Sequence, residues 1–268
     1  MYKKIIFLLF LCFCFVQIKL QAQIVDTTAI KITDTLKFRG TVCASSLPNY
    51  ALKKEIKKYI LPTALFTYGL ITPSIKGLKK LDESIKEKTL QNNNRKEFRV
   101  DDFAQYSPIA TVYALNIAGY KGKNNLKDAS LILVTSKIIS TVGAQGIKRI
   151  TKRLRPDSSS NNSFPSGHTT EAFANATFLY QEYKDKNIWI GIAGYAVASA
   201  TAYLRIYNNR HWLSDVVAGA GVGIASTKFA YWLYPKISKA LFKKNSSNTV
   251  LIPSYSNGNF SMNFVKHF

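Results

Sequence analysis

Several long stretches of the chain contain no charged residue, and they limit it to folds built from buried or lipid-exposed helices. The clearest of these stretches are 59–75, 103–120 and 187–204. A helix that is apolar on every side is surrounded by other protein or by lipid. The stretches are close to the length of about 20 residues that a membrane span needs. We therefore expect a mainly α-helical bundle and favour a membrane-embedded one, with a soluble bundle of fully buried helices as the alternative.

Apolar periodicity and helix-stop signals predict where the helices lie. Helices are expected at 59–75, 78–90, 103–120, 129–154, 169–183, 187–204 and 211–234. The pair Asp101-Asp102 is interpreted as the cap of the third helix, which Pro108 breaks, and Pro156 is expected to stop the fourth. The helix at 78–90 is amphipathic, and both a surface helix on a soluble core and a helix at a membrane interface fit it.

Glycines in the last predicted helix indicate close packing. Gly219 and Gly223 are four positions apart, the spacing that lets a neighbouring helix approach closely. The surrounding Gly-Ala-Gly-Val-Gly run is not a dinucleotide-binding loop, because it follows no strand and lacks the third glycine of that motif.

The two ends of the chain differ from the helical middle. Lys3 and Lys4 precede an apolar run, the layout of a signal peptide over 1–22 with cleavage after Ala22, although an uncleaved anchor has the same pattern. Residues 23–50 are expected to be irregular, and 51–245 to form the helical domain. At 246–268, an Asn-Gly pair between β-rich segments predicts a C-terminal β-hairpin with a type I′ turn.

The formal net charge of +22 points to an anionic partner, such as nucleic acid, anionic lipid or a phosphorylated substrate. An exported protein does not meet nucleic acid, so the predicted signal peptide favours the other two. Beyond that peptide the chain keeps one cysteine, Cys43, which excludes an internal disulfide and a thiolate metal site. We expect an envelope protein associated with the membrane, and the sequence gives no expectation for its oligomeric state.

Three short motifs between residues 148 and 215 contain the residues suited to phosphate chemistry. In the first, Lys148 and Arg155 are seven positions apart, so on a continuous helix both would lie on one face with Lys152 between them. Basic residues at the end of a helix also stabilise its dipole, so this pair alone has a structural explanation as well.

The second motif, Pro165-Ser166-Gly167-His168, breaks the chain and opens a helix. The N–H groups of Ser166 and Gly167 would be free at this helix end, which is where an oxyanion binds. Gly167 would allow an oxygen close to the backbone, and His168 would lie beside it for proton transfer. The same residues would also be found where a proline, serine and glycine simply mark the start of a helix.

The third motif contains Arg205, His211 and Asp215. His211 and Asp215 are four positions apart and would share a helix face, where a carboxylate can fix the tautomer of an imidazole. A structural hydrogen bond would also explain the pair. No Cys, Glu or further His accompanies it, so we expect no metal here.

Taken together, the three motifs resemble the signature of the type 2 phosphatidic acid phosphatase (PAP2) superfamily, which shares its fold with vanadium haloperoxidases. That signature reads K-x6-RP, then PSGH, then SR-x5-H-x3-D, and the chain matches it in order over 148–215. It departs from the pattern at Leu204, which stands where the family has serine, and in the short connection between Pro156 and Pro165.

The resemblance implies a fold, an activity and a role for each matched residue. It implies a PAP2-type helical bundle in which His211 attacks phosphorus, Asp215 supports its ring and His168 acts as acid and then as base. The remaining matched residues would bind the phosphoryl oxygens: Lys148, Arg155, Ser166, Gly167 and Arg205. No metal or other cofactor is implied.

The expected function is therefore hydrolysis of a lipid phosphomonoester or diphosphate, at a site that faces the periplasm. The candidate substrates that the resemblance implies are phosphatidate, phosphatidylglycerol phosphate, undecaprenyl diphosphate and the phosphate groups of lipid A, and we favour lipid A or an isoprenyl diphosphate for an exported protein. Three alternatives stay open: a soluble periplasmic acid phosphatase acting on small phosphoesters, a vanadate-dependent haloperoxidase, and a non-catalytic envelope protein that binds anionic lipid.

Overall fold

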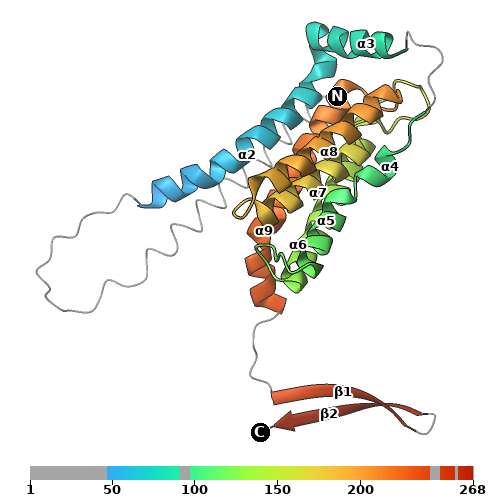
Figure 1. The fold of residues 1–268 in the computed structure, drawn as a ribbon. Helices are drawn as coiled ribbons and strands as arrows, with labels where there is room; N and C mark the ends of the chain where they lie inside the picture. The colour runs from blue at the N-terminus through green and yellow to red at the C-terminus, as the bar shows by residue number, and fades with distance from the viewer. Residues whose placement is uncertain (1–46, 91–96, 242–247, 257–258, 268) are drawn as a thin grey trace, which may run out of the picture. The chain divides into compact units, whose positions relative to one another are not determined.

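The computed structural model describes residues 47–90, 97–241, 248–256 and 259–267 of the chain (Figure 1). The predicted signal peptide over 1–22 lies outside these residues. So does most of the segment expected to be irregular, although its last residues, from Leu47 on, already belong to a helix.

The described residues form mostly helices, as predicted. The helices are α2 (Leu47–Ile71), the 3-10 helix η1 (Thr72–Ser74), α3 (Lys76–Leu90), α4 (Asp101–Ala104), α5 (Ser107–Ile117), α6 (Leu126–Thr151), α7 (Gly167–Tyr183), α8 (Ile188–Tyr207) and α9 (Leu213–Leu241). The predicted helices are all present, but some boundaries differ. Pro62 lies inside α2 instead of near its start, and α6 stops before Leu154.

The helix α6 ends at Thr151 because Lys152 adopts the left-handed conformation, with φ 45°. This backbone conformation closes many helices at their C-terminal end. The chain then continues as an irregular connection to α7. The predicted helix 129–154 therefore extended three residues too far, and this difference matters for the site described below.

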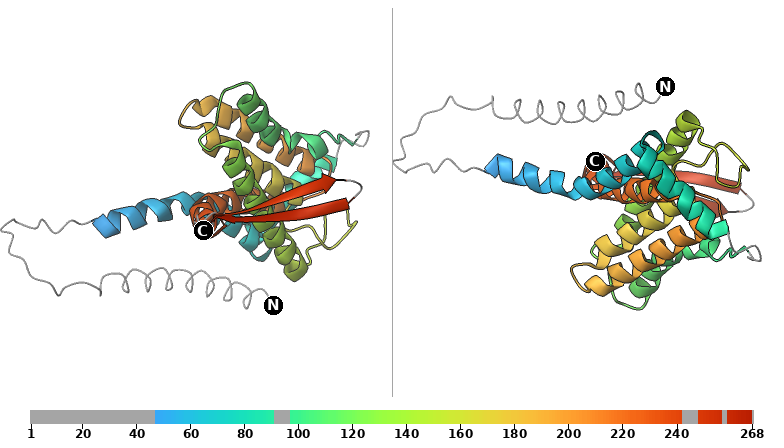
Figure 2. Two further views of the ribbon diagram at one scale, coloured as in Figure 1. Left: turned by 90° about the horizontal axis from the view of Figure 1, so that it is seen from below. Right: turned by 90° about the horizontal axis from the view of Figure 1, so that it is seen from above.

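The helix α7 lies at the centre of the bundle and packs against α5, α6, α8 and α9 (Figures 1 and 2). Its side chains are buried on nearly every face, and Phe178 and Tyr183 are fully enclosed. They join Val112 of α5 and Ile132 of α6 in the main hydrophobic cluster. Each large apolar side chain buried there contributes about 1.5–3 kcal/mol relative to exposure.

Two glycines of α9 allow it to approach α7 at backbone distance, as the sequence predicted. A Cβ atom on Gly219 would lie 2.7 Å from the carbonyl oxygen of Ser166. One on Gly223 would meet the carbonyl oxygen of Thr170 and would lie 2.8 Å from the nitrogen of Ala174. Any side chain at these positions would push the two helices apart.

One face of α6 is apolar and exposed. Val134, Ile138 and Val142 are four residues apart, and 54–67 % of each is exposed. Such a stripe on a helix that packs its other side in a bundle is suited to contact with lipid. Among the described residues, two helices are long and apolar enough to cross a membrane, over Leu126–Thr151 and Leu213–Lys239.

Near the C-terminus, β1 (Asn248–Ser256) pairs antiparallel with β2 (Asn259–His267). The register places Val250 opposite Val265 and Ser256 opposite Asn259. The two residues between the strands, Asn257 and Gly258, lie outside the described residues. The type I′ hairpin therefore stays a prediction.

Candidate active site

The three sequence motifs meet at one end of the bundle. The first is divided between the end of α6 and the connection after it, the second opens α7, and the third joins α8 to α9. Since α6 ends at Thr151, Lys148 belongs to the helix whereas Arg155 follows it. The prediction that both lie on one helical face was wrong: the irregular connection, not helical periodicity, places Arg155.

His211 lies just before α9, not within it, and is only 3 % exposed. Its Nδ1 atom is 3.7 Å from Oδ2 of Asp215 in the first turn of α9. The same Oδ2 accepts the Trp212 N–H at 3.0 Å and the hydroxyl of Ser163. The two residues are close, but the prediction that both lie on one helix was wrong, because His211 precedes α9. The carboxylate of Asp215, in the first turn, instead reaches back over the start of the helix, as in a capping box.

Burial lowers the pKa of His211 to about 4, against the opposing effect of the Asp215 carboxylate. The imidazole is therefore neutral at physiological pH, which is the form able to act as a nucleophile or a base. Because Nδ1 faces Asp215, the other ring nitrogen, Nε2, is the one directed away from the carboxylate.

The matched cations Lys148, Arg155 and Arg205 are largely removed from solvent. Lys148 and Arg205 are 8 % and 9 % exposed, and Nζ of Lys148 donates to the carbonyl oxygen of Asn162 at 2.5 Å. The Nε atoms of Arg155 and Arg205 are buried and have no hydrogen-bond partner. Buried guanidinium groups with unused donors suit an oxyanion, which can accept several such bonds at once.

The start of α7 provides fewer free donors than the sequence suggested. Ser166 is the N-cap residue, and its N–H donates to the carbonyl oxygen of Asp215 at 3.0 Å. That donor is unavailable to a ligand, contrary to the prediction. At Gly167, an added Cβ would meet only Cε of Lys148, at 4.0 Å. An oxyanion beside Lys148 would thus lie near the Gly167 amide, one of the first-turn donors that a helix leaves unpaired.

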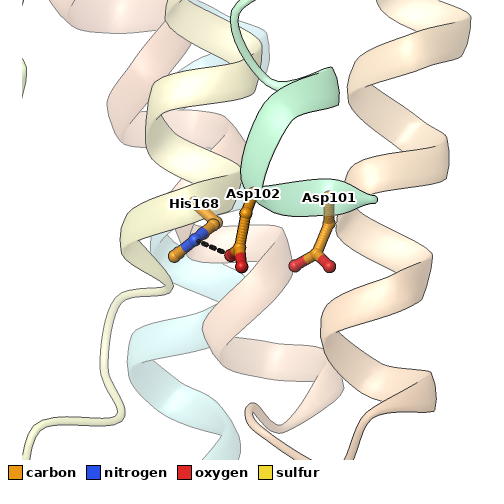
Figure 3. Close-up of side chains that lie close together, drawn as sticks. All are labelled: Asp101, Asp102 and His168. Carbon is orange, nitrogen blue, oxygen red and sulfur yellow. Dashed lines mark hydrogen bonds and ion pairs between the residues drawn. The ribbon is translucent and has the colours of Figure 1, made fainter. Parts of the chain in front are cut away.

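The short helix α4 brings two carboxylates to this end of the bundle (Figure 3). Nε2 of His168 lies 2.9 Å from Oδ1 of Asp102. Arg205 forms an ion pair with Asp101, and its Nη1 atom is 3.6 Å from Oδ1 of Asp102. Asp101 and Asp102 were interpreted from the sequence as a helix cap, but Val100 precedes them as N-cap and their side chains face site residues.

These three residues form the one group in the described part of the chain whose spacing could suit a metal ion. The ligand atoms of Asp101, Asp102 and His168 all lie within 4.8 Å of one another. The guanidinium of Arg205 contacts both carboxylates, so a cation of the protein already balances their charge. Burial raises the pKa of Asp102, but hydrogen bonds from His168 and Arg99 outweigh it and hold that pKa below its usual value.

A second group of residues that sequence reasoning missed supports Asp215. Arg153 donates to Oδ1 of Asp215 and to Oγ of Ser214, both at 2.7 Å, and to Oδ2 of Asp82 at 2.9 Å. Asp82 is a buried residue of the amphipathic helix α3 and also accepts the Ser214 N–H. Arg153 belonged to a visible basic cluster, but nothing in the sequence singled it out from its neighbours.

Comparison with known proteins agrees with this geometry. The family model of the PAP2 superfamily matches residues 129–239, which include every residue that carries the three motifs. The chain is therefore similar to the PAP2 superfamily over the part that carries the motifs. The match begins within α6, so Asp82, Asp101 and Asp102 lie before it.

Two curated relatives and one solved structure show what the chain is similar to. It is 38 % identical over 57 % of its length to lipid A 1-phosphatase of Porphyromonas gingivalis, and 37 % identical over 29 % to the bacitracin transport permease protein BcrC of Bacillus licheniformis. It spans 35 % and 36 % of those two proteins.

The solved structure is the transmembrane PAP2-type phosphatidylglycerolphosphate phosphatase of Bacillus subtilis. It shares 20 % identity and a TM-score of 0.50 over 66 % of this chain and 97 % of that one, which shows a common fold.

Proposed function

We propose that this protein is a metal-independent phosphatase that hydrolyses a lipid phosphomonoester or diphosphate through a phosphohistidine intermediate. The observation that supports it best is the set of buried cations near His211. Arg155 and Arg205 each have a buried, unpartnered Nε, and a phosphoryl group is an anion that would use both. Lys148 adds a third positive charge to the same site.

In the first step, Nε2 of neutral His211 attacks phosphorus. The N–P bond forms as the bond to the leaving oxygen breaks, and His168 gives that oxygen a proton. Asp215 accepts the Nδ1–H of His211 and stabilises the positive charge that develops on its ring. Lys148, Arg155, Arg205 and the Gly167 amide stabilise the negative charge on the phosphoryl oxygens.

In the second step, His168 is neutral and takes a proton from a water molecule as the water attacks phosphorus. The N–P bond breaks, inorganic phosphate leaves and His211 returns to its neutral form. The lowered pKa of His211 helps both steps, because the free ring is unprotonated at the start and is a good leaving group at the end.

A lipid substrate is supported by the exposed apolar face of α6 and by the relatives. The proteins similar to this chain are named for lipid A, for bacitracin transport and for phosphatidylglycerolphosphate. The net charge of +22 favours an anionic headgroup at a membrane surface. We propose that the site faces the periplasm of an exported, envelope-bound protein, with lipid A, undecaprenyl diphosphate and phosphatidate as the substrates to compare.

The test is phosphate release by the purified chain in detergent, with EDTA present, from each of these three lipids. His211→Ala should lower the rate by about a thousandfold or more, because the nucleophile is lost. His267→Asn is the matched control, since it replaces the histidine outside the motifs and should keep the wild-type rate. Acid-labile radioactive phosphate should be trapped on the wild-type protein and on His267→Asn.

Two results would overturn the proposal. One is undiminished phosphate release by His211→Ala, and the other is loss of wild-type activity in EDTA that added divalent metal restores. If the protein hydrolyses small phosphoesters, without detergent or lipid, as fast as it hydrolyses the three lipids, the proposed substrate would be a soluble phosphoester instead of a lipid.

A further inference from the structure

The mechanism leaves one close contact in the site without a role. Nε2 of His168, on α7, lies 2.9 Å from Oδ1 of Asp102, on α4 (Figure 3). The two residues are 66 positions apart in the chain. An imidazole with one nitrogen on a carboxylate has a fixed ring orientation and a fixed tautomer. Asp215 is the carboxylate partner of His211, and Asp102 would likewise fix the ring orientation and the tautomer of His168.

The segment that carries Asp102 is held in place by contacts that do not involve the site. The side chain of Asn208 accepts the Phe98 N–H at 3.1 Å and donates to the Phe98 carbonyl oxygen at 2.8 Å. Arg210 donates to Glu97 at 2.7 Å. These bonds attach the chain just before α4 to the connection between α8 and α9, so the position of Asp102 is determined independently of His168.

The charges around His168 come from α4 and α8. Asp102 and Asp101 face it from α4, with Arg99 just before that helix, and Arg205 faces it from α8. Arg205 is paired with Asp101, which leaves Asp102 as the carboxylate in direct contact with the ring. Burial and the charge of Arg205 lower the pKa of His168, and the negative charge of Asp102 opposes them by favouring the protonated imidazole that an acid needs.

We infer that Asp102 is a positioning residue that accepts the Nε2–H of His168, which makes Nδ1 the atom that exchanges protons with the substrate. In the first step Nδ1–H gives its proton to the leaving oxygen, and His168 becomes neutral while Nε2–H stays on Asp102. In the second step Nδ1 takes a proton from water. This inference rests on the proposed phosphatase function and adds a residue from outside the family match.

The test compares two substrates that differ in how much they need an acid. An alkyl phosphate, such as a short-chain phosphatidate, has a poor leaving oxygen that requires a proton. The p-nitrophenolate ion leaves readily without one. Asp102→Asn and His168→Asn should both slow the alkyl phosphate at least tenfold more than they slow p-nitrophenyl phosphate. Glu87→Gln is the matched control, because it removes an exposed carboxylate of α3 that does not belong to the segment holding Asp102.

Two further measurements separate positioning from folding. In the pH profile of kcat/KM, the alkaline limb of Asp102→Asn should lie at a pH about one unit lower than in the wild type, because the charge favouring protonated His168 is gone. Combining Asp102→Asn with His168→Asn should cause little more loss than His168→Asn alone, since one residue acts through the other. Asp102→Glu keeps the negative charge but displaces it. Compared with Asp102→Asn, it should return the alkaline limb to the wild-type pH and recover part of the rate.

The inference is overturned if Asp102→Asn slows both substrates equally, leaves both unchanged, or adds its full effect to His168→Asn. Should Asp102→Asn not fold, the same comparison is made with Asp102→Glu, for which equal slowing of both substrates has the same meaning. Failure of the proposed function looks different: the wild-type protein would release no phosphate, or His211→Ala would release it normally.

Discussion

Replacing Arg153 with alanine tests whether the residues behind Asp215 support the site. Arg153 makes three hydrogen bonds, and its side chain is 15 % exposed. Its removal leaves the carboxylates of Asp82 and Asp215 buried without their shared cation. Breaking a buried ion pair from one side costs about 3–5 kcal/mol.

Both carboxylates keep other donors, so we expect the lower end of that range, a loss of about 3 kcal/mol in the free energy of unfolding. Asp82 keeps the N–H and hydroxyl of Ser214, and Asp215 keeps the Trp212 N–H and Ser163. For a chain of this size the loss corresponds to a fall of about 6–12 °C in Tm. Activity should fall about 10- to 100-fold, because Asp215 still has two donors to hold it beside His211.

The measurements are thermal unfolding in detergent, followed by tryptophan fluorescence, and release of p-nitrophenol from its phosphate ester. Lys152→Asn is the matched control. It removes the neighbouring, exposed positive charge, and asparagine tolerates the left-handed backbone at that position, with φ 45°. The control should keep the wild-type Tm and rate. If Arg153→Ala unfolds within about 2 °C of the wild type and keeps its kcat, the role assigned to this network is wrong.

Three other perturbations have expected outcomes. Gly223→Ala should destabilise the protein by about 1–3 kcal/mol because its Cβ meets the backbone of α7, whereas Gly143→Ala, with nothing within 4 Å, should be neutral or stabilising by up to about 1 kcal/mol; unfolding in detergent measures both. Histidine-selective NMR should show His211 neutral down to a pH of about 4. Since this pKa lies below the unfolded value of about 6.5, stability should fall as pH falls between the two, and a pH-independent Tm over that range would contradict the burial of a neutral ring. Phosphate release should persist in EDTA, because Lys148, Arg155 and Arg205 provide the positive charge; a chelator-sensitive rate would require a metal.

The helices were predictable because their signals are local. An uncharged stretch such as 187–204 has to be buried or placed in lipid wherever it lies in the chain. Gly219 and Gly223 likewise indicated close packing before α7 was known to be the neighbour. These features depend on residues within a few turns of one another.

The errors share one cause, which is backbone geometry between helices. Helical spacing placed Arg155 on α6 and His211 on α9, and both lie outside those helices. Each residue still reaches the site, but through an irregular connection whose path depends on tertiary contacts. One of those contacts, from the Ser166 N–H to the Asp215 carbonyl oxygen, also removed a donor that the sequence had assigned to phosphate.

The acidic partners of the site were the hardest residues to find, and their positions explain why. The three motifs hold several cations but a single carboxylate, Asp215, and a site with that composition would bring unbalanced positive charge into the bundle. The balance comes from Asp82, Asp101 and Asp102, each contributed by a segment before residue 129, where the family match begins. Asp82 stands in an amphipathic helix and looks like any solvated residue until Arg153 and Ser214 are seen beside it. The cations of the candidate site can therefore be recognised from a local motif, whereas the carboxylates that pair with them follow only from the packing of α3 and α4.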